Sequence, residues 1–390
     1  MRVALVAPPH LPCPPPGYGG VERVFASLVQ GLLRWGVRVT VFAHPESFND
    51  RLTDSPTHRL TDSPTHRLTD SPTHRLTDSP TERLLVQVPT YAPVGRLHPQ
   101  AAEMRHTQVA ARFISDVGTF DIIHDHTRLG AVDFAALDVP AVTTAHYDPT
   151  RDPMRWAREV AAGHPYVALS NAQMRSAPDV NWTGVIPNGI DQSFYRPGED
   201  RFGYLVHIAA LGPRKGTDLA IRIARAAGRQ LVVIGSADRA DPEGFAREVE
   251  PLLGDEHVTW LDEQSGDAKL PWLQGAAALL HPIRWDEPFG LVYVEALACG
   301  VPVLTLNRGA APELVQHGVT GVVADQWTDL IDAARDPHRW SPQACRASVS
   351  HLTDDAMVEA YLNLYEQLID RGTRPKPIPR QRRASLPISP

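Results

Sequence analysis

The chain has 390 residues, of which 43% are hydrophobic and 21% are charged, a balance typical of a globular protein with room for two domains. Its formal net charge of −7 argues against a nucleic-acid binder, because such binding depends on a cationic surface. Three widely spaced cysteines provide neither a disulfide framework nor a zinc motif. No apolar run reaches the roughly 20 residues that span a bilayer. We expect a cytoplasmic protein. The sequence leaves open whether it also contacts the inner face of the membrane as a peripheral protein.

Short apolar runs alternate with helical patterns along most of the chain. In the first half, strands are predicted at 3–7, 37–42, 120–124, 141–144, 166–169 and 184–186. In the second half, strands are predicted at 204–208, 231–234, 257–261, 278–280, 302–306 and 322–324. Helical segments separate these strands, for example at 218–227, 245–253, 291–298 and 355–370. This alternation predicts an α/β protein with two parallel sheets, as in two Rossmann-like doubly wound domains that face a central cleft.

An octapeptide repeat interrupts the first half. Arg-Leu-Thr-Asp-Ser-Pro-Thr-His occurs three times between residues 51 and 74, and a fourth copy ends in Glu82. The repeated histidines could form a binding array. However, each unit has one proline and one large apolar residue, which cannot build a stacked core. We therefore predict a tolerated surface loop over 51–82.

The strongest chemical signal is the block that contains Glu287 and Glu295. Glu287-Pro-Phe-Gly290 predicts a turn into a helix that starts near Leu291, whose free backbone amides form an anion site. Glu295 follows about one turn later, where its carboxylate could accept hydrogen bonds from neighbouring hydroxyls. A sugar joined to a phosphate and a ribose would suit this pattern. The alternative is a capping glutamate followed by an ordinary surface glutamate.

Three further signals lie at strand ends. Lys215 stands between a strand and a helix, where it could neutralise a leaving diphosphate or simply be solvated. His146 closes a strand and would point into a ligand cleft, although a buried histidine is the commoner case. The turn Gly17-Tyr-Gly-Gly20 would let a ligand approach the backbone closely.

The segment His124-Asp-His126 raises the question of a metal site. Alternate residues of a strand share one face, so the two imidazoles could converge. No third ligand has a suitable spacing, and the chain has no Asp-x-Asp pair. We expect a protein without a metal or cofactor, in which His124 and Asp125 shape the acceptor side of the cleft or merely pack.

Together these motifs resemble the retaining glycosyltransferases of family four. The motifs that carry the resemblance stand in the family's order: Gly17-x-Gly19-Gly20-Val-Glu22, His124-Asp-His126, His146, Ser170-Asn-Ala, Ile186-Pro-Asn-Gly-Ile-Asp191, Lys215-Gly216 and the glutamate block. The resemblance implies the GT-B fold. It also implies transfer of a hexose, with retention, from a nucleotide-diphosphate sugar such as a UDP-sugar to a sugar, lipid or small-molecule acceptor.

The resemblance also implies roles for individual residues. Glu287 would bind hydroxyls of the transferred sugar, Glu295 the ribose, and His146 a hydroxyl near the reacting carbon. The implied donor site consists of Gly19, Gly20, Arg214, Lys215, Glu287, Phe289, Gly290, Leu291 and Glu295, with catalytic roles for His146, Lys215 and Glu287. The implied acceptor side consists of Gly17, His124 and Asp125.

A turn-rich linker near residue 187 and the composition of the tail predict the domain boundaries, and the resemblance implies the role of each part. Residues 1–186 would form the acceptor domain and residues 187–350 the nucleotide-sugar domain. A helix over 351–370 would cross back to the first domain, and the basic, proline-rich stretch 371–390 would be disordered.

One departure from the family pattern stands out. Ala209-Ala210 replaces the usual Gly-Arg, whose arginine also grips the diphosphate, unless Arg214 takes over that role. This departure leaves a second hypothesis open, a catalytically silent subunit that binds sugar or a partner protein. A phosphorylase or a nucleotide-sugar epimerase fits less well, because the former would need a pyridoxal phosphate lysine and the latter would lack the glutamate block.

Overall fold

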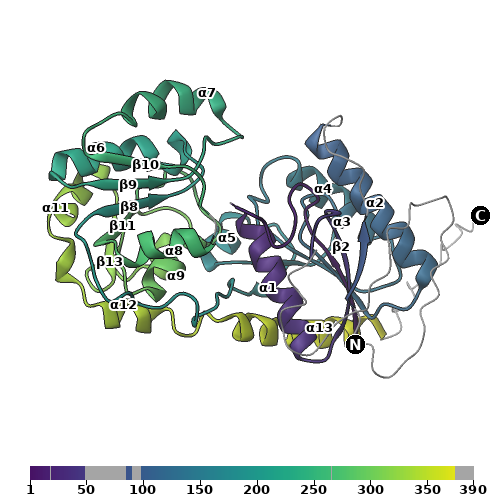
Figure 1. Ribbon diagram of the computed structural model, residues 1–390. Helices are drawn as coiled ribbons and strands as arrows, with labels where there is room; N and C mark the ends of the chain where they lie inside the picture. The colour runs from purple at the N-terminus through teal and green to yellow at the C-terminus, as the bar shows by residue number, and fades with distance from the viewer. Residues whose placement is uncertain (18, 49–84, 90–97, 265, 374–390) are drawn as a thin grey trace, which may run out of the picture.

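The computed structural model describes residues 1–17, 19–48, 85–89, 98–264 and 266–373. The repeat at 51–82 and the tail beyond residue 373 lie outside these ranges, so the predicted loop and disordered tail stay predictions. The described chain folds around two sheets that lie side by side (Figure 1).

The first sheet has seven parallel strands in the order β3-β2-β1-β4-β5-β6-β7. Its strands are β1 (Arg2–Val6), β2 (Arg38–Ala43), β3 (Leu85–Pro89), β4 (Ile122–Asp125), β5 (Ala141–Thr144), β6 (Tyr166–Ala168) and β7 (Trp182–Val185). All six strands predicted in this half are confirmed. The edge strand β3 was missed, because it is short, follows the repeat directly and ends in a proline, which is tolerated at a sheet edge.

The second sheet has six parallel strands in the order β10-β9-β8-β11-β12-β13. Its strands are β8 (Leu205–Ile208), β9 (Leu231–Ile234), β10 (Val258–Leu261), β11 (Ala278–His281), β12 (Val303–Leu306) and β13 (Gly321–Ala324). All six were predicted, since buried parallel strands are short, continuous apolar runs.

Helices cover both sheets. Around the first sheet lie α1 (Gly20–Arg34), α2 (Pro99–Val117), α3 (Ala131–Phe134), α4 (Met154–Val160) and α5 (Asn171–Ser176). Around the second lie α6 (Thr217–Ala227), α7 (Pro242–Gly244), α8 (Gly266–Gln274), α9 (Leu291–Ala298), α10 (Ala311–Leu314), α11 (Leu330–Arg335) and α12 (Pro342–Ser348). Short 3₁₀ or π turns are η2 (Pro213–Lys215), η3 (Phe245–Val249), η4 (Glu250–Leu252), η5 (Trp327–Asp329) and η6 (Pro337–Arg339).

The helix predicted at 245–253 was wrong in its regularity. The segment consists of the π turn η3 and the 3₁₀ turn η4 instead of one α-helix. Pro251 is the physical reason, because a proline inside a helix removes a backbone donor and clashes with the preceding turn.

The last helix, α13 (Asp354–Thr373), leaves the second sheet and runs along the first domain beside α1 (Figure 1). Met357, Val358, Tyr361 and Tyr365 join the hydrophobic core of the first sheet. The approach to α1 is close, because a Cβ on Gly31 would lie 2.3 Å from a methyl carbon of Val358. Glycine at position 31 therefore permits the helix contact.

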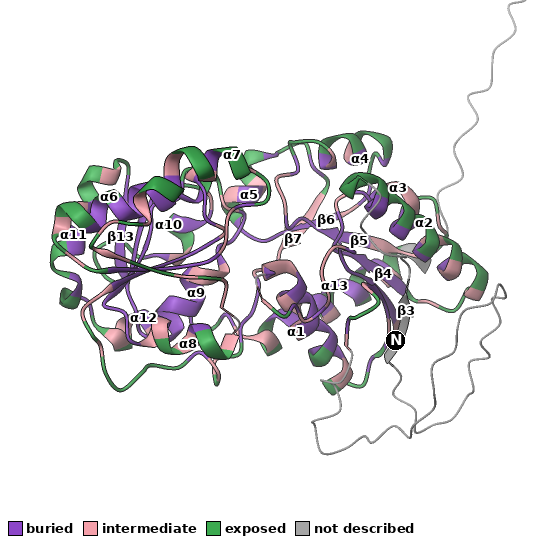
Figure 2. Cartoon of the chain, turned by 45° about the horizontal axis from the view of Figure 1, so that its top comes forward, coloured by how far each residue is buried: buried purple, intermediate pink, exposed green. Residues whose placement is uncertain are grey.

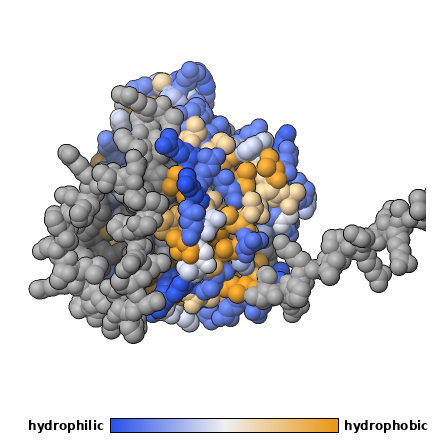
Figure 3. Space-filling model, turned by 90° about the vertical axis from the view of Figure 1, so that its right-hand side faces the viewer, coloured by the Kyte–Doolittle hydropathy of each residue, from blue (hydrophilic) through white to orange (hydrophobic). Residues whose placement is uncertain are grey.

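The strands are largely buried, and the outward faces of the helices are exposed (Figure 2). The end of the molecule formed by the first domain carries patches of hydrophobic residues among hydrophilic ones (Figure 3). In the described ranges, no helix combines the length and the apolar character that crossing a membrane requires.

Candidate nucleotide-sugar site

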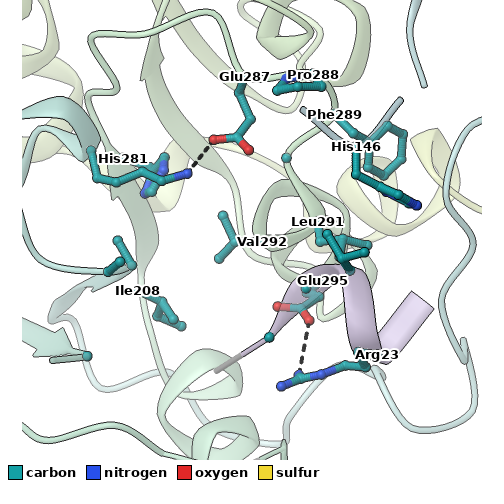
Figure 4. A pocket seen from close by; sticks show the side chains of 18 of the residues that line it. Arg23, His146, Ile208, His281, Glu287, Pro288, Phe289, Leu291, Val292 and Glu295 are labelled. Atoms are coloured by element: carbon teal, nitrogen blue, oxygen red, sulfur yellow. Dashed lines mark hydrogen bonds and ion pairs between the residues drawn. The ribbon is translucent and has the colours of Figure 1, made fainter. Parts of the chain in front are cut away.

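A cavity of about 420 Å³ lies between the two domains, and residues of both domains line it (Figure 4). Ten residues predicted from the sequence line this cavity: Gly19, Gly20, His146, Arg214, Lys215, Glu287, Phe289, Gly290, Leu291 and Glu295. Parallel strands end and helices begin at this edge of each sheet, which is where α/β folds bind ligands.

Glu287 lies in the loop between β11 and α9 and receives two donors. The Nζ of Lys215 lies 2.5 Å from its Oε2, and the indole Nε1 of Trp285 donates to the same oxygen at 3.0 Å. Gly290, which precedes α9, has a φ of 95°, and a Cβ there would lie 2.5 Å from the ring of Tyr293. Glycine is therefore required for the turn that brings Glu287 and the first amides of α9 to the cavity.

Glu295, on α9, lies at the centre of a second polar network. Its Oε2 accepts a hydrogen bond from the Nζ of Lys269 at 2.6 Å, and its Oε1 accepts one from the hydroxyl of Tyr195 at 2.7 Å. Arg23 reaches across from α1 of the other domain, with Nη1 3.7 Å from Oε1 (Figure 4). Burial raises the pKa of the Glu295 carboxyl, but the charges of Lys269 and Arg23 outweigh burial and hold that pKa below its usual value.

Sequence reasoning missed Lys269, Tyr195 and Arg23. None of them belongs to the glutamate block, and each comes from a different part of the chain. Arg23 directly follows the glycine motif, but nothing in that motif indicates that its side chain reaches the other domain.

Arg214 lies beside the gap left by Ala210. Its Nη2 is 3.1 Å from Oδ2 of Asp238, and its guanidinium carbon is 4.8 Å from the ring centroid of Trp285. The Nζ of Lys215 lies 4.9 Å from the same ring. One tryptophan thus supports both cations through cation–π contacts, and Ala210 lines the cavity next to them.

His146 follows β5 and lines the cavity as a neutral imidazole. Its Nε2 lies 2.8 Å from Nδ1 of His126. Burial lowers the pKa of His146 to about 3. At neutral pH its ring can therefore exchange hydrogen bonds with a hydroxyl but carries no charge.

The sequence predicts that His124 shapes the acceptor side of the cleft or merely packs, and burial of the side chain favours packing. The residue is fully buried, its Nδ1 lies 2.6 Å from the hydroxyl of Tyr365 and its Nε2 lies 2.7 Å from Oγ1 of Thr144. The imidazole has no exposed surface to offer a substrate. His124 therefore packs, which was the alternative left open by the sequence.

Asp125 is also fully buried, which favours the same alternative for this residue. Its two oxygens accept hydrogen bonds from the backbone amide of Thr127 and the hydroxyl of Thr143, both at 2.9 Å. Burial raises the pKa of this carboxyl to about 7. Asp125 thus shapes the loop behind β4 without contact with the cavity.

Gly17 does not line the cavity described here but lies where the two domains approach. A Cβ on Gly17 would lie only 2.1 Å from Oε1 of Glu263 in the second domain. Its carbonyl oxygen accepts a hydrogen bond from Arg23 at 3.1 Å. The glycine therefore permits contact between the domains.

The two histidines of the His124-Asp-His126 segment do converge, with ring centroids 4.1 Å apart. Three of their four ring nitrogens bond protein groups, however: Nδ1 of His126 contacts His146, and the two nitrogens of His124 contact Tyr365 and Thr144. Within the described part of the chain, no group of three or more histidine, cysteine or acidic residues could hold a metal ion.

Paired lysines and glutamates thus meet in the cavity between two Rossmann-like domains. Residues 18–194 match the family model described as Glycosyltransferase Family 4, and residues 193–336 match the model described as Glycosyl transferases group 1. The chain belongs to the glycosyltransferases of family four.

Curated relatives carry the name D-inositol 3-phosphate glycosyltransferase. The protein of Mycolicibacterium paratuberculosis is 29% identical over 296 residues, which are 63% of this chain and 67% of the relative. The protein of Mycobacterium tuberculosis strain F11 is 29% identical over 266 residues, 57% of this chain. The matched residues cover 55% of the length of that second relative.

Solved structures of similar architecture confirm the expected GT-B fold. Sucrose-phosphate synthase from Thermosynechococcus elongatus superposes with a TM-score of 0.69 at 19% identity, over 95% of this chain and 100% of the other. AviGT4, a glycosyltransferase involved in avilamycin A biosynthesis, gives a TM-score of 0.65 at 22% identity, over 95% and 98%. HepE of Anabaena, solved with UDP and glucose, gives 0.66 at 17% identity, over 94% and 100%.

Proposed function

We propose that this chain transfers a hexose from a nucleotide-diphosphate sugar to an acceptor hydroxyl, with retention of anomeric configuration and without a metal or cofactor. The observation that carries the proposal is the pairing of Lys215 with Glu287 and of Lys269 with Glu295 in one interdomain cavity. A UDP-sugar is the donor we favour, because HepE has been solved with UDP-glucose.

In this proposal the second domain binds the donor. Glu287 accepts hydrogen bonds from the sugar hydroxyls, and Glu295 accepts them from the ribose. The free amides at the start of α9 face the diphosphate, where the positive end of the helix favours an anion. The ammonium of Lys215 shifts part of its interaction from Glu287 to the donor. There it stabilises the negative charge that develops on the leaving diphosphate.

The first domain supplies the acceptor side of the cavity. His146 offers a neutral ring nitrogen to a hydroxyl near the reacting carbon. The acceptor is a sugar, a lipid or a small molecule with a free hydroxyl. We also propose a cytoplasmic location, which agrees with three unpaired and buried cysteines.

The proposal is tested by calorimetric titration of the purified protein with UDP-, GDP-, ADP- and dTDP-glucose in the presence of EDTA. We expect one donor to bind and to be turned over when acceptors are added, with the product's anomeric configuration read by NMR. Glu287→Gln should reduce turnover far more than donor binding, since a neutral amide cannot hold Lys215 and the sugar hydroxyls in the same way. Failure of every donor to bind a folded sample would reject the proposal.

The second hypothesis, a silent subunit, has one observation in its favour. The position of the usual arginine is Ala210, and the nearby Arg214 is already close to Asp238. Tight donor binding without transfer to any acceptor, and without slow hydrolysis, would favour this hypothesis.

A further inference from the structure

The chain makes exceptionally little use of lysine. It contains 35 arginines but only three lysines. Lys376 lies outside the described residues, and the other two, Lys215 and Lys269, both line the interdomain cavity. Arginine is the more common partner of a buried carboxylate, so lysine at both of these positions indicates a need for a compact, single-point cation.

The two described lysines have matching surroundings. Their side chains are 10% and 8% exposed, and each ammonium lies 2.5 or 2.6 Å from one of the two glutamates of the site. Lys215 already has a place in the proposed donor site through Glu287. Lys269, on α8, has no assigned role.

Lys269 lies between Glu295 and an aromatic ring. Its Nζ is 2.6 Å from Oε2 of Glu295 and 5.6 Å from the ring centroid of Tyr195. The hydroxyl of Tyr195 donates to the other carboxylate oxygen at 2.7 Å. The carboxylate is therefore held at both oxygens, and each oxygen keeps a lone pair for a further hydrogen bond.

We propose that Lys269 is a positioning residue for the donor, which keeps Glu295 charged and in one orientation so that its carboxylate can accept the two ribose hydroxyls of the nucleotide. This inference rests on the proposed function. It assigns to Lys269 no contact with the reacting atoms.

The charged and titratable groups around Glu295 explain why Lys269 matters. They are Lys269 from α8, Arg23 from α1, Tyr195 from the interdomain segment and the buried thiol of Cys299, which directly follows α9. Arg23 is the other cation, but it lies at 3.7 Å and belongs to the opposite domain. Without Lys269, burial would dominate and raise the pKa of Glu295.

The test is the dissociation constant of UDP-glucose measured between pH 6 and 9 for the wild type and for Lys269→Met. The wild type should change little over this range. Lys269→Met should bind about 10-fold or more weakly at pH 6, and recover as the pH rises, because a raised pKa lets Glu295 lose its proton only at higher pH. A merely structural loss would lower affinity equally at every pH.

A double-mutant cycle separates positioning from an independent contact. Lys269→Met should have no further effect on donor affinity in a Glu295→Gln background, because residues that act through one group are not additive. The double variant also leaves no unpaired buried charge, so it keeps the test possible if Lys269→Met alone fails to fold. A further 10-fold loss in the double variant would overturn the proposal.

Arg225→Met is the matched control. Arg225 lies on α6 in the same domain, pairs with Asp255 at 3.8 Å and does not line the cavity described here, so donor affinity should be unchanged. If the wild type binds no nucleotide sugar, the proposed function falls and this inference falls with it. If the wild type binds and Lys269→Met matches it at every pH, only this inference is overturned.

Discussion

The hydroxyl of Tyr365 lies 2.6 Å from Nδ1 of His124, although 241 residues separate them in the chain. This contact joins the last helix, α13, to strand β4 at the centre of the first sheet. The other ring nitrogen of His124 contacts Thr144, whose hydroxyl oxygen lies 2.8 Å from the hydroxyl of Tyr361. A buried polar network therefore joins α13 to strands β4 and β5 of the first sheet.

Tyr365→Phe should destabilise the protein without an effect on donor binding. The change leaves Nδ1 of His124 without this partner in a fully buried position, at a cost of about 1–3 kcal/mol. Tyr361→Phe is the matched control with a smaller expected loss, because Thr144 keeps its contact with His124. Urea denaturation measures the free energy of unfolding, and calorimetry measures UDP-glucose affinity. If Tyr365→Phe instead slowed sugar transfer to the acceptor at unchanged stability, a role for His124 on the acceptor side of the cleft would be supported.

Ala210→Arg should strengthen binding of UDP. The new guanidinium would reach the cavity beside Lys215, where a charged hydrogen bond to the diphosphate contributes about 1.5–3 kcal/mol, or at least 10-fold in affinity. Ala210→Gln, of similar length but uncharged, is the control and should have a much smaller effect. Equal affinity in wild type and Ala210→Arg would mean that Arg214 already supplies this contact.

Glu295→Ala should abolish the protein's ability to distinguish ribose from deoxyribose. The wild type is expected to bind UDP about 10-fold or more tightly than 2′,3′-dideoxy-UDP, because the carboxylate accepts hydrogen bonds from the hydroxyls. The variant should bind both nucleotides equally weakly. Circular dichroism verifies the fold. Preference for UDP that survives in the variant would refute the ribose assignment.

The free energy of unfolding should fall steeply as the pH drops below about 6.5. Burial lowers the pKa of seven histidines in the described residues: His106, His124, His126, His146, His164, His207 and His281. Below pH 6.5 the unfolded chain binds protons that the folded chain does not. Each histidine then costs about 1.4 kcal/mol of stability per pH unit.

Four carboxyls of the described residues, whose pKa burial raises, act in the opposite direction: Glu22, Asp125, Asp133 and Asp354. Burial raises the pKa of Asp125 to about 7 and that of Asp354 to about 6, so the folded state keeps these protons as the pH falls and gains stability. Seven histidines outweigh four carboxyls, and the net effect is acid destabilisation. Chemical denaturation at pH 5 to 8 checks the slope, and His207→Gln should lessen it by about one histidine's share. A flat profile would contradict the neutral state of these histidines.

Local sequence patterns were sufficient to predict twelve of the thirteen described strands and the turn into α9. Short apolar runs separated by turns identify buried parallel strands, and the glycine at position 290 is required by its own backbone angle. The glutamate block likewise lies within a single loop and helix. Each of these features depends on residues close together in the chain.

Tertiary structure alone decided what surrounds each functional side chain. Alternation along a strand places His124 and His126 on one face, but the sequence cannot indicate that α13 arrives from the far end of the chain to cover that face. Glu295 likewise meets Lys269 from α8 once the second domain has folded, and it meets Arg23 from α1 only when the two domains come together. Burial and charge at a site result from distant segments, and they determine whether a side chain packs, positions another group or remains available to a ligand.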